Sequence, residues 1–94
     1  MKPSEILSKI RKKNWVQGQY WDMDDSGLKF CFNGFILNET LGYAEPQNGD
    51  IDLERIYGHC ARFIHDVIAD INDSKFTFTA NKKMAIQFLE REGL

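Results

Sequence analysis

The chain has 94 residues, of which 43% are hydrophobic and 13% aromatic, so it can bury the core of one domain and is not a disordered chain. Its formal net charge of −2 creates no field that would draw it to nucleic acid or to a membrane surface. Two cysteines allow at most one disulfide. The first residues lack the apolar core of a signal peptide, and no apolar run reaches the ~20 residues of a membrane span. We therefore expect a small cytoplasmic domain.

Residues 4–13 have the pattern of a short helix. Ser4 can cap its first turn, and Ile6, Leu7 and Ile10 form a narrow apolar stripe. Positive charge gathers in the last turn, where it suits the helix dipole; it comes from Lys9, Arg11, Lys12 and Lys13. Because a solvated, dipole-matched helix end explains this cluster, we do not expect nucleic acid as a partner.

Large aromatic residues gather in the next segment, residues 15–27, where the helical period is lost. Trp15, Tyr20 and Trp21 lie around Gly18, and an acidic turn follows, formed by Asp24, Asp25, Ser26 and Gly27. We expect this segment to be irregular or weakly extended. Exposed aromatics beside a glycine would form a binding surface, whereas aromatics so close to two helices would complete the core.

The acidic turn begins like a calcium-binding loop. Counted from Asp22, oxygen-bearing side chains occupy the first, third and fifth places, and Gly27 occupies the sixth. The twelfth place holds Asn33 instead of a bidentate glutamate, and no helix clearly enters the loop. We therefore predict no metal site in this turn.

Residues 28–41 are compatible with two structures. The first residues alternate as in a strand, and Asn33-Gly34 is a favoured two-residue hairpin turn. As a helix, the same run is apolar nearly all round, as in a fully buried helix, and Gly42 can end it. We favour the helix and keep the hairpin as the alternative.

The strongest helical pattern covers residues 52–71. Asp50 or Asp52 can cap this helix, and Asn72 is suited to its end. A wide apolar face without charges must be covered by other elements, so we predict that this is the central core helix, with Cys60 buried. The apolar residues of this face are Leu53, Ile56, Tyr57, Cys60, Phe63, Ile64, Val67, Ile68 and Ile71.

The predicted fold is mainly α. A single domain over residues 1–94 contains about four helices packed around helix 52–71. Thr79 can cap the last helix, which ends near Glu92. A minor two-stranded β ribbon is also expected, from residues 16–23 and 76–78.

The histidines and cysteines are the candidates for chemistry. On a helix, Cys60 and His65 point about 140° apart, so with His59 they cannot converge on zinc. Cys31 is the better candidate nucleophile, with a histidine as base, and a thiol-dependent enzyme is therefore one alternative function. A pocket for a small ligand or nucleotide is another. A small buried thiol is the default role of such a cysteine.

Three short motifs resemble an uncharacterised family of small bacterial and phage proteins, a domain of unknown function. The family has a Trp-x-x-Gly element, a Cys-x-x-Gly helix and a later helix that ends in Asn-Asp. The similar residues here are Trp15-Val16-Gln17-Gly18, Cys31-Phe32-Asn33-Gly34 and Asn72-Asp73.

The resemblance has consequences for the fold. It implies a helix at residues 28–41, although Phe35 and Ile71 replace a small residue and a tryptophan of the family pattern. It also implies proximity among five residues, namely Trp15, Gly18, Cys31, Asn72 and Asp73.

Together, these patterns and the resemblance predict a small, non-catalytic protein-interaction module, encoded by a phage or mobile element and acting on a host protein. We expect the partner to bind the aromatic and acidic segment 15–27, without a cofactor or metal and without a membrane. A homodimer is compatible with the aromatic content. The candidate binding residues are Trp15, Gly18, Tyr20, Trp21, Asp24, Asp25, Cys31, Asn72 and Asp73.

Overall fold

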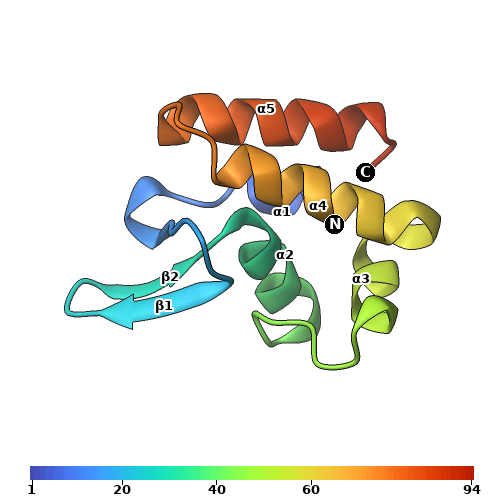
Figure 1. Ribbon diagram of the computed structural model, residues 1–94, viewed down its shortest axis with the longest axis horizontal. Coiled ribbons are helices and arrows are strands. Elements are labelled where there is room, and N and C mark those ends of the chain that lie inside the picture. The colour runs from blue at the N-terminus through green and yellow to red at the C-terminus, as the bar shows by residue number, and fades with distance from the viewer.

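Two antiparallel helices, α4 (Ala61–Asn72) and α5 (Phe78–Arg91), lie side by side along the long axis of the molecule (Figure 1). The computed structural model describes all 94 residues. Three further helices complete the helical body, and these are α1 (Pro3–Leu7), α2 (Phe32–Leu41) and α3 (Asp50–Tyr57). Strands β1 (Trp21–Asp24) and β2 (Gly27–Phe30) form an antiparallel hairpin. The prediction of a mainly α fold with a minor two-stranded ribbon is therefore confirmed.

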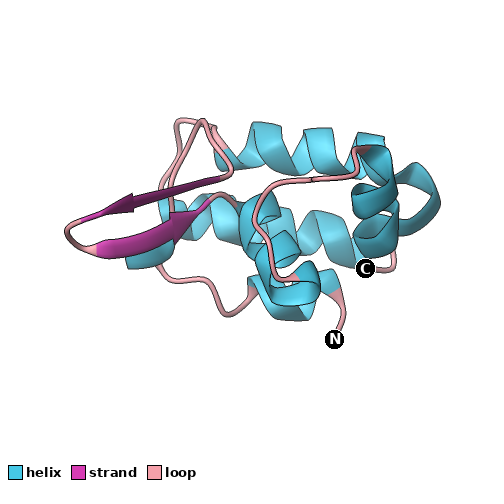
Figure 2. Cartoon of the chain, turned by 90° about the horizontal axis from the view of Figure 1, so that it is seen from below, coloured by secondary structure: helices cyan, strands magenta, loops and turns pink.

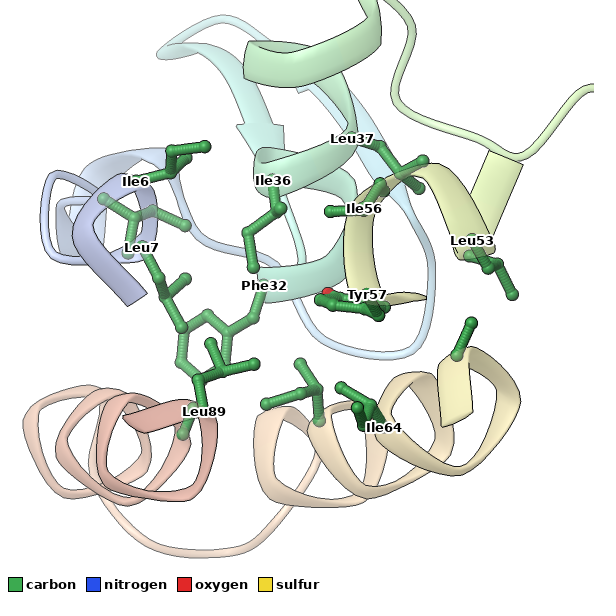
Figure 3. Close-up of a cluster of buried hydrophobic side chains, with 14 residues drawn as sticks. Ile6, Leu7, Phe32, Ile36, Leu37, Leu53, Ile56, Tyr57, Ile64 and Leu89 are labelled. Atoms are coloured by element: carbon green, nitrogen blue, oxygen red, sulfur yellow. The ribbon is translucent and has the colours of Figure 1, made fainter. Parts of the chain in front are cut away.

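The core lies between all five helices, with Phe32 of α2 near its centre. Figure 3 shows the Phe32 ring between Leu7 of α1 and Leu89 of α5, and none of these three side chains has solvent-exposed surface. Full burial of one such side chain contributes roughly 1.5–3 kcal/mol. The other buried apolar residues of this cluster are Ile6, Ile10, Ile36, Leu37, Leu53, Ile56, Tyr57, Ala61, Ile64, Ile68 and Ala85.

The predicted helix 52–71 is in fact two helices, because Gly58 interrupts it. Gly58 has φ 77° and ψ −145°, a conformation that residues with side chains rarely adopt. A 3-10 turn, η2 (Gly58–Cys60), then leads into α4. The break rotates the buried face of α4 by about 100°, or one helical residue. Cys60 and Phe63 are consequently exposed, and the prediction of a buried Cys60 is wrong.

Residues 28–41 combine the two structures expected for them. Residues 28–30 belong to β2, and α2 begins at Phe32. The predicted helix is thus correct from Phe32 onward and wrong for its first residues, and Asn33-Gly34 lies inside the helix instead of forming a hairpin turn. Gly42, with φ 87°, ends α2 as predicted.

The ribbon pairs different strands from those predicted. Trp21 stands opposite Phe30 and Met23 opposite Leu28 in the hairpin, so residues 76–78 take no part in it. The chain turns there and enters α5, whose cap is Thr77, since the Ala80 N–H donates to its hydroxyl at 3.1 Å. The predicted cap, Thr79, instead lies within the first turn.

The predicted caps Ser4 and Asp52 have other roles. Ser4 lies inside α1, a helix shorter than the one predicted, and its hydroxyl donates to the Leu94 carbonyl at 2.9 Å. Asp52 is fully buried and accepts hydrogen bonds from the backbone of Gln47 and Asn48 at 2.7 and 2.8 Å. Its carboxylate therefore fixes the loop that precedes α3. No helix has both the length and the apolarity needed to cross a membrane.

Candidate functional site

The buried side chain of Asn72, at the end of α4, joins segments that are far apart in the sequence. Its Oδ1 accepts hydrogen bonds from the Trp15 indole at 2.8 Å and from the Phe32 backbone at 2.9 Å. Its amide nitrogen donates to the Val16 carbonyl at 3.1 Å and to Asp73 at 3.0 Å. These four bonds use the hydrogen-bonding capacity of a carboxamide, so Asn72 acts as a structural joint.

Trp15 and Gly18 are held at the same helix end. The Trp15 ring lies 5.2 Å from that of Phe78 and 6.1 Å from that of Phe32, measured between centroids, and so completes the core. The Gly18 backbone donates to Asp73 Oδ1 at 2.9 Å, with φ 81°. Glycine adopts this left-handed conformation without strain.

Cys31 is buried and caps α2. Its Sγ accepts a hydrogen bond from the Gly34 backbone at 3.2 Å. Burial raises the pKa of this thiol to about 11, which leaves it protonated and weakly nucleophilic at neutral pH. The nearby imidazole of His65 bonds other side chains. This geometry does not favour the alternative of a thiol-dependent enzyme.

Gly34 allows α2 to approach the segment before the hairpin. A Cβ atom at this position would collide with the Tyr20 carbonyl oxygen. That same oxygen accepts a hydrogen bond from the Cys31 backbone at 3.0 Å. The glycine of the Cys-x-x-Gly motif is therefore required for close contact between two backbones, and the contact fixes Tyr20.

A cavity of about 220 Å³ opens beside this junction, between α4, the start of α2 and the segment that leads into β1. The predicted proximity of the motif residues is confirmed, since four of them line this cavity and Trp15 bonds one of the four. The residues around the cavity are Gly18, Gln19, Tyr20, Cys31, Asn33, His65, Ala69, Asn72 and Asp73.

A chain of hydrogen bonds orients Tyr20 in this cavity. Its hydroxyl lies 2.8 Å from Nε2 of His65, and Nδ1 of His65 lies 3.0 Å from Asp66 Oδ1. The hydrogen bond from His65 lowers the pKa of Asp66, so this carboxylate is an acceptor and Nδ1 is assigned as the donor. In a neutral His65, Nε2 then accepts the Tyr20 hydrogen, and the lone pairs of the Tyr20 oxygen remain available to the cavity.

A second feature is the hairpin, which extends beyond the helices in both views (Figures 1 and 2). Trp21, Met23 and Leu28 lie on one face of it, because alternate residues of a strand share a face and Met23 pairs with Leu28. Their exposed fractions are 44%, 64% and 38%. Asp24 pairs with Lys29 at 3.3 Å on the other face, so the two faces differ in chemistry.

The predicted site residues therefore fall into two groups. Asp24 and Asp25 lie at the exposed hairpin tip with Trp21, whereas Tyr20 and the motif residues surround the cavity. Sequence reasoning missed the lining residue Asn33 and the exposed face of the hairpin, and it considered His65 only as a zinc ligand, which it excluded, and as a candidate base for Cys31. The alternation in residues 28–30, which we assigned to a helix, was the signal for that face.

Comparison with known proteins adds nothing to this geometry. No family model, no curated protein and no solved structure matches the chain. Membership in the bacterial and phage family of the three motifs therefore stays a prediction.

Proposed function

We infer that this protein is a small, non-catalytic protein-interaction module whose docking surface is the apolar face of the hairpin, formed by Trp21, Met23 and Leu28. The observation that carries this proposal is the exposure of three large apolar side chains on one face of a projecting element. Scattered exposed apolar residues are ordinary, but a contiguous group indicates an interaction site. Trp21 and Met23 belong to the segment 15–27 that the sequence pointed to, and Leu28 lies just beyond it.

The hairpin is anchored well enough to present this face. Phe30, on the same face as Trp21, is buried and packs edge-on against Phe35 with 6.0 Å between centroids. The Phe30 carbonyl also accepts a hydrogen bond from the Val16 backbone at 3.0 Å. An isolated two-stranded hairpin is marginally stable, and these contacts supply the support that it needs.

Trp21 is the expected centre of the interface. Tryptophan is enriched among the residues that dominate binding energy, and the Trp21 indole donates to Glu45 at 2.8 Å, which holds the ring in place. A preorganised aromatic side chain loses less entropy on binding. The resemblance to phage proteins supports a host protein as the partner.

Partner capture with matched variants tests the proposal. The test variant combines Trp21→Ala, Met23→Ser and Leu28→Ser, and the control is Phe63→Ser, which removes an aromatic that is 57% exposed on α4. We expect a partner from the source cell that binds the wild type and the control, and whose affinity for the triple variant is at least about tenfold lower, a modest value for the loss of an interface centre. If no captured protein depends on the hairpin face, the proposal is wrong.

A further inference from the structure

We propose that the cavity beside Tyr20 receives a lysine side chain of the docked partner, an inference that rests on the proposed docking function. The apolar face of the hairpin would be the first contact with the partner, and the cavity next to it would be the second. Tyr20 lines the cavity and the adjacent residue, Trp21, begins the hairpin. Because the two residues are adjacent in the chain, the cavity lies beside the base of the hairpin that carries the docking surface.

Two polar groups at the cavity can accept a hydrogen bond from an incoming side chain, the Tyr20 hydroxyl and the Asp73 carboxylate. The Tyr20 hydroxyl lies 2.8 Å from Nε2 of His65, and when it donates its hydrogen to this nitrogen its oxygen can accept a further hydrogen bond. Asp73 uses Oδ1 for its bonds with Gly18 and Asn72, so Oδ2 is without a hydrogen-bond partner in the protein. A primary ammonium has three donors and no acceptor, and it therefore complements this pair of groups.

The charge at the edge of the cavity is negative, which also favours a cationic side chain. No lysine or arginine lines it, and Asp73 is the charged residue at its edge. Arg62 shares the carboxylate of Asp66 with His65, but its guanidinium lies 2.8 Å from Asp50 and 3.7 Å from Asp66. Two carboxylates therefore already offset the charge of Arg62. A cationic side chain entering the cavity would meet an uncompensated carboxylate, whereas an anionic one would be repelled.

The size and walls of the cavity suit one extended side chain. Its volume of about 220 Å³ is below the roughly 300–1,000 Å³ of pockets for drug-sized ligands. Ala69, the Cys31 thiol and the Tyr20 ring give it apolar walls. Lysine combines an apolar stem with a charged end, so its stem can pack on these walls while the ammonium reaches Tyr20 and Asp73.

Peptide titration followed by NMR tests this inference on the whole protein. The probe is acetyl-Gly-Lys-Gly-amide, and its control contains norleucine, which keeps a similar alkyl stem and lacks the ammonium. We expect the lysine peptide to shift the backbone amide signals of Gly18, Tyr20 and Asp73 in a saturable manner, and the norleucine peptide to leave them unchanged. Equal shifts with both peptides, or none with either, would overturn the inference.

Two isosteric variants separate a specific contact from general electrostatics. Asp73→Asn keeps an oxygen for Gly18 and loses the charge, whereas Asp25→Asn makes the same charge change at the hairpin tip. Exposed ion pairs contribute little free energy. We therefore expect the lysine peptide to bind Asp73→Asn about two- to fivefold more weakly than the wild type and to bind Asp25→Asn unchanged. Equal weakening in the two variants would contradict a lysine site in the cavity. The capture assay with the hairpin variant is independent, so the docking proposal can survive failure of the lysine site.

Discussion

Replacement of Asn72 by alanine should destabilise the fold strongly, because one side chain joins three segments. The variant leaves the buried Phe32 N–H and the half-buried Trp15 indole N–H without their acceptor, and the Val16 carbonyl without a donor. A stranded donor costs about 1–3 kcal/mol, so the two donors together cost about 2–6 kcal/mol. Whole domains of this kind are stable by only about 5–15 kcal/mol.

The assay is urea unfolding followed by circular dichroism, with Asn38→Ala as the matched control. Asn38 is half-buried on α2 and its side chain makes no hydrogen bond within the protein. We expect a drop in melting temperature of about 10 °C or more for Asn72→Ala and little change for the control. In a Trp15→Phe background, the Asn72→Ala cost should fall by about 1 kcal/mol, since one donor is already absent. Equal stability of the two alanine variants would refute the role of Asn72.

Three further outcomes follow from particular contacts. Gly34→Ala should lower the free energy of unfolding by about 1–3 kcal/mol, although alanine favours helices, because its Cβ collides with the Tyr20 carbonyl; an unchanged urea midpoint would contradict this. Cys60, which is exposed, should react with a thiol reagent in the folded protein, while Cys31, whose pKa burial raises to about 11, should react only on unfolding; fast labelling of both would restore the thiol-enzyme alternative. Hydrogen bonds from the backbone of the preceding loop lower the pKa of Asp52, so its stabilisation is present above about pH 4 and lost as the pH falls through the folded-state pKa. Unfolding midpoints measured against pH should therefore fall less steeply in acid for Asp52→Asn than for the wild type.

The sequence predicted the helical class well and the interruption of its main helix poorly. The apolar periodicity of residues 52–71 continues through Gly58, so a count of spacing cannot detect a break that depends on one backbone conformation. Once the chain turns there, His65 and Asn72 face inward. Both are polar, and pattern reasoning placed His65 away from the core and Asn72 only at the end of a helix. They are buried because Tyr20, Trp15 and Phe32 supply hydrogen-bond partners from distant segments.

The candidate site was predictable in part for similar physical reasons. The short motifs identified the residues that meet at the end of α4. Trp15 supplies an indole donor, Gly18 adopts a positive φ, and Asn72 both donates and accepts hydrogen bonds there. The hairpin was hidden because residues 28–30 and the helix after them form one apolar run. Asn33-Gly34 has the composition of a hairpin turn, yet the hairpin turns at Asp25 and Ser26, within the acidic turn predicted at residues 24–27. Only the three-dimensional structure shows that Phe30 and α2 belong to the core, whereas Trp21, Met23 and Leu28 form an exposed face.

Site-specific photo-crosslinking in the source cell tests the docking proposal most directly. A photoreactive residue would replace Met23 on the hairpin face, or Gln87 on the exposed side of α5 as the control. The docking proposal predicts one discrete crosslinked protein from position 23, lost when Trp21→Ala is added, and no such product from position 87. The same product from both positions, or none from position 23, would contradict a docking role for the hairpin.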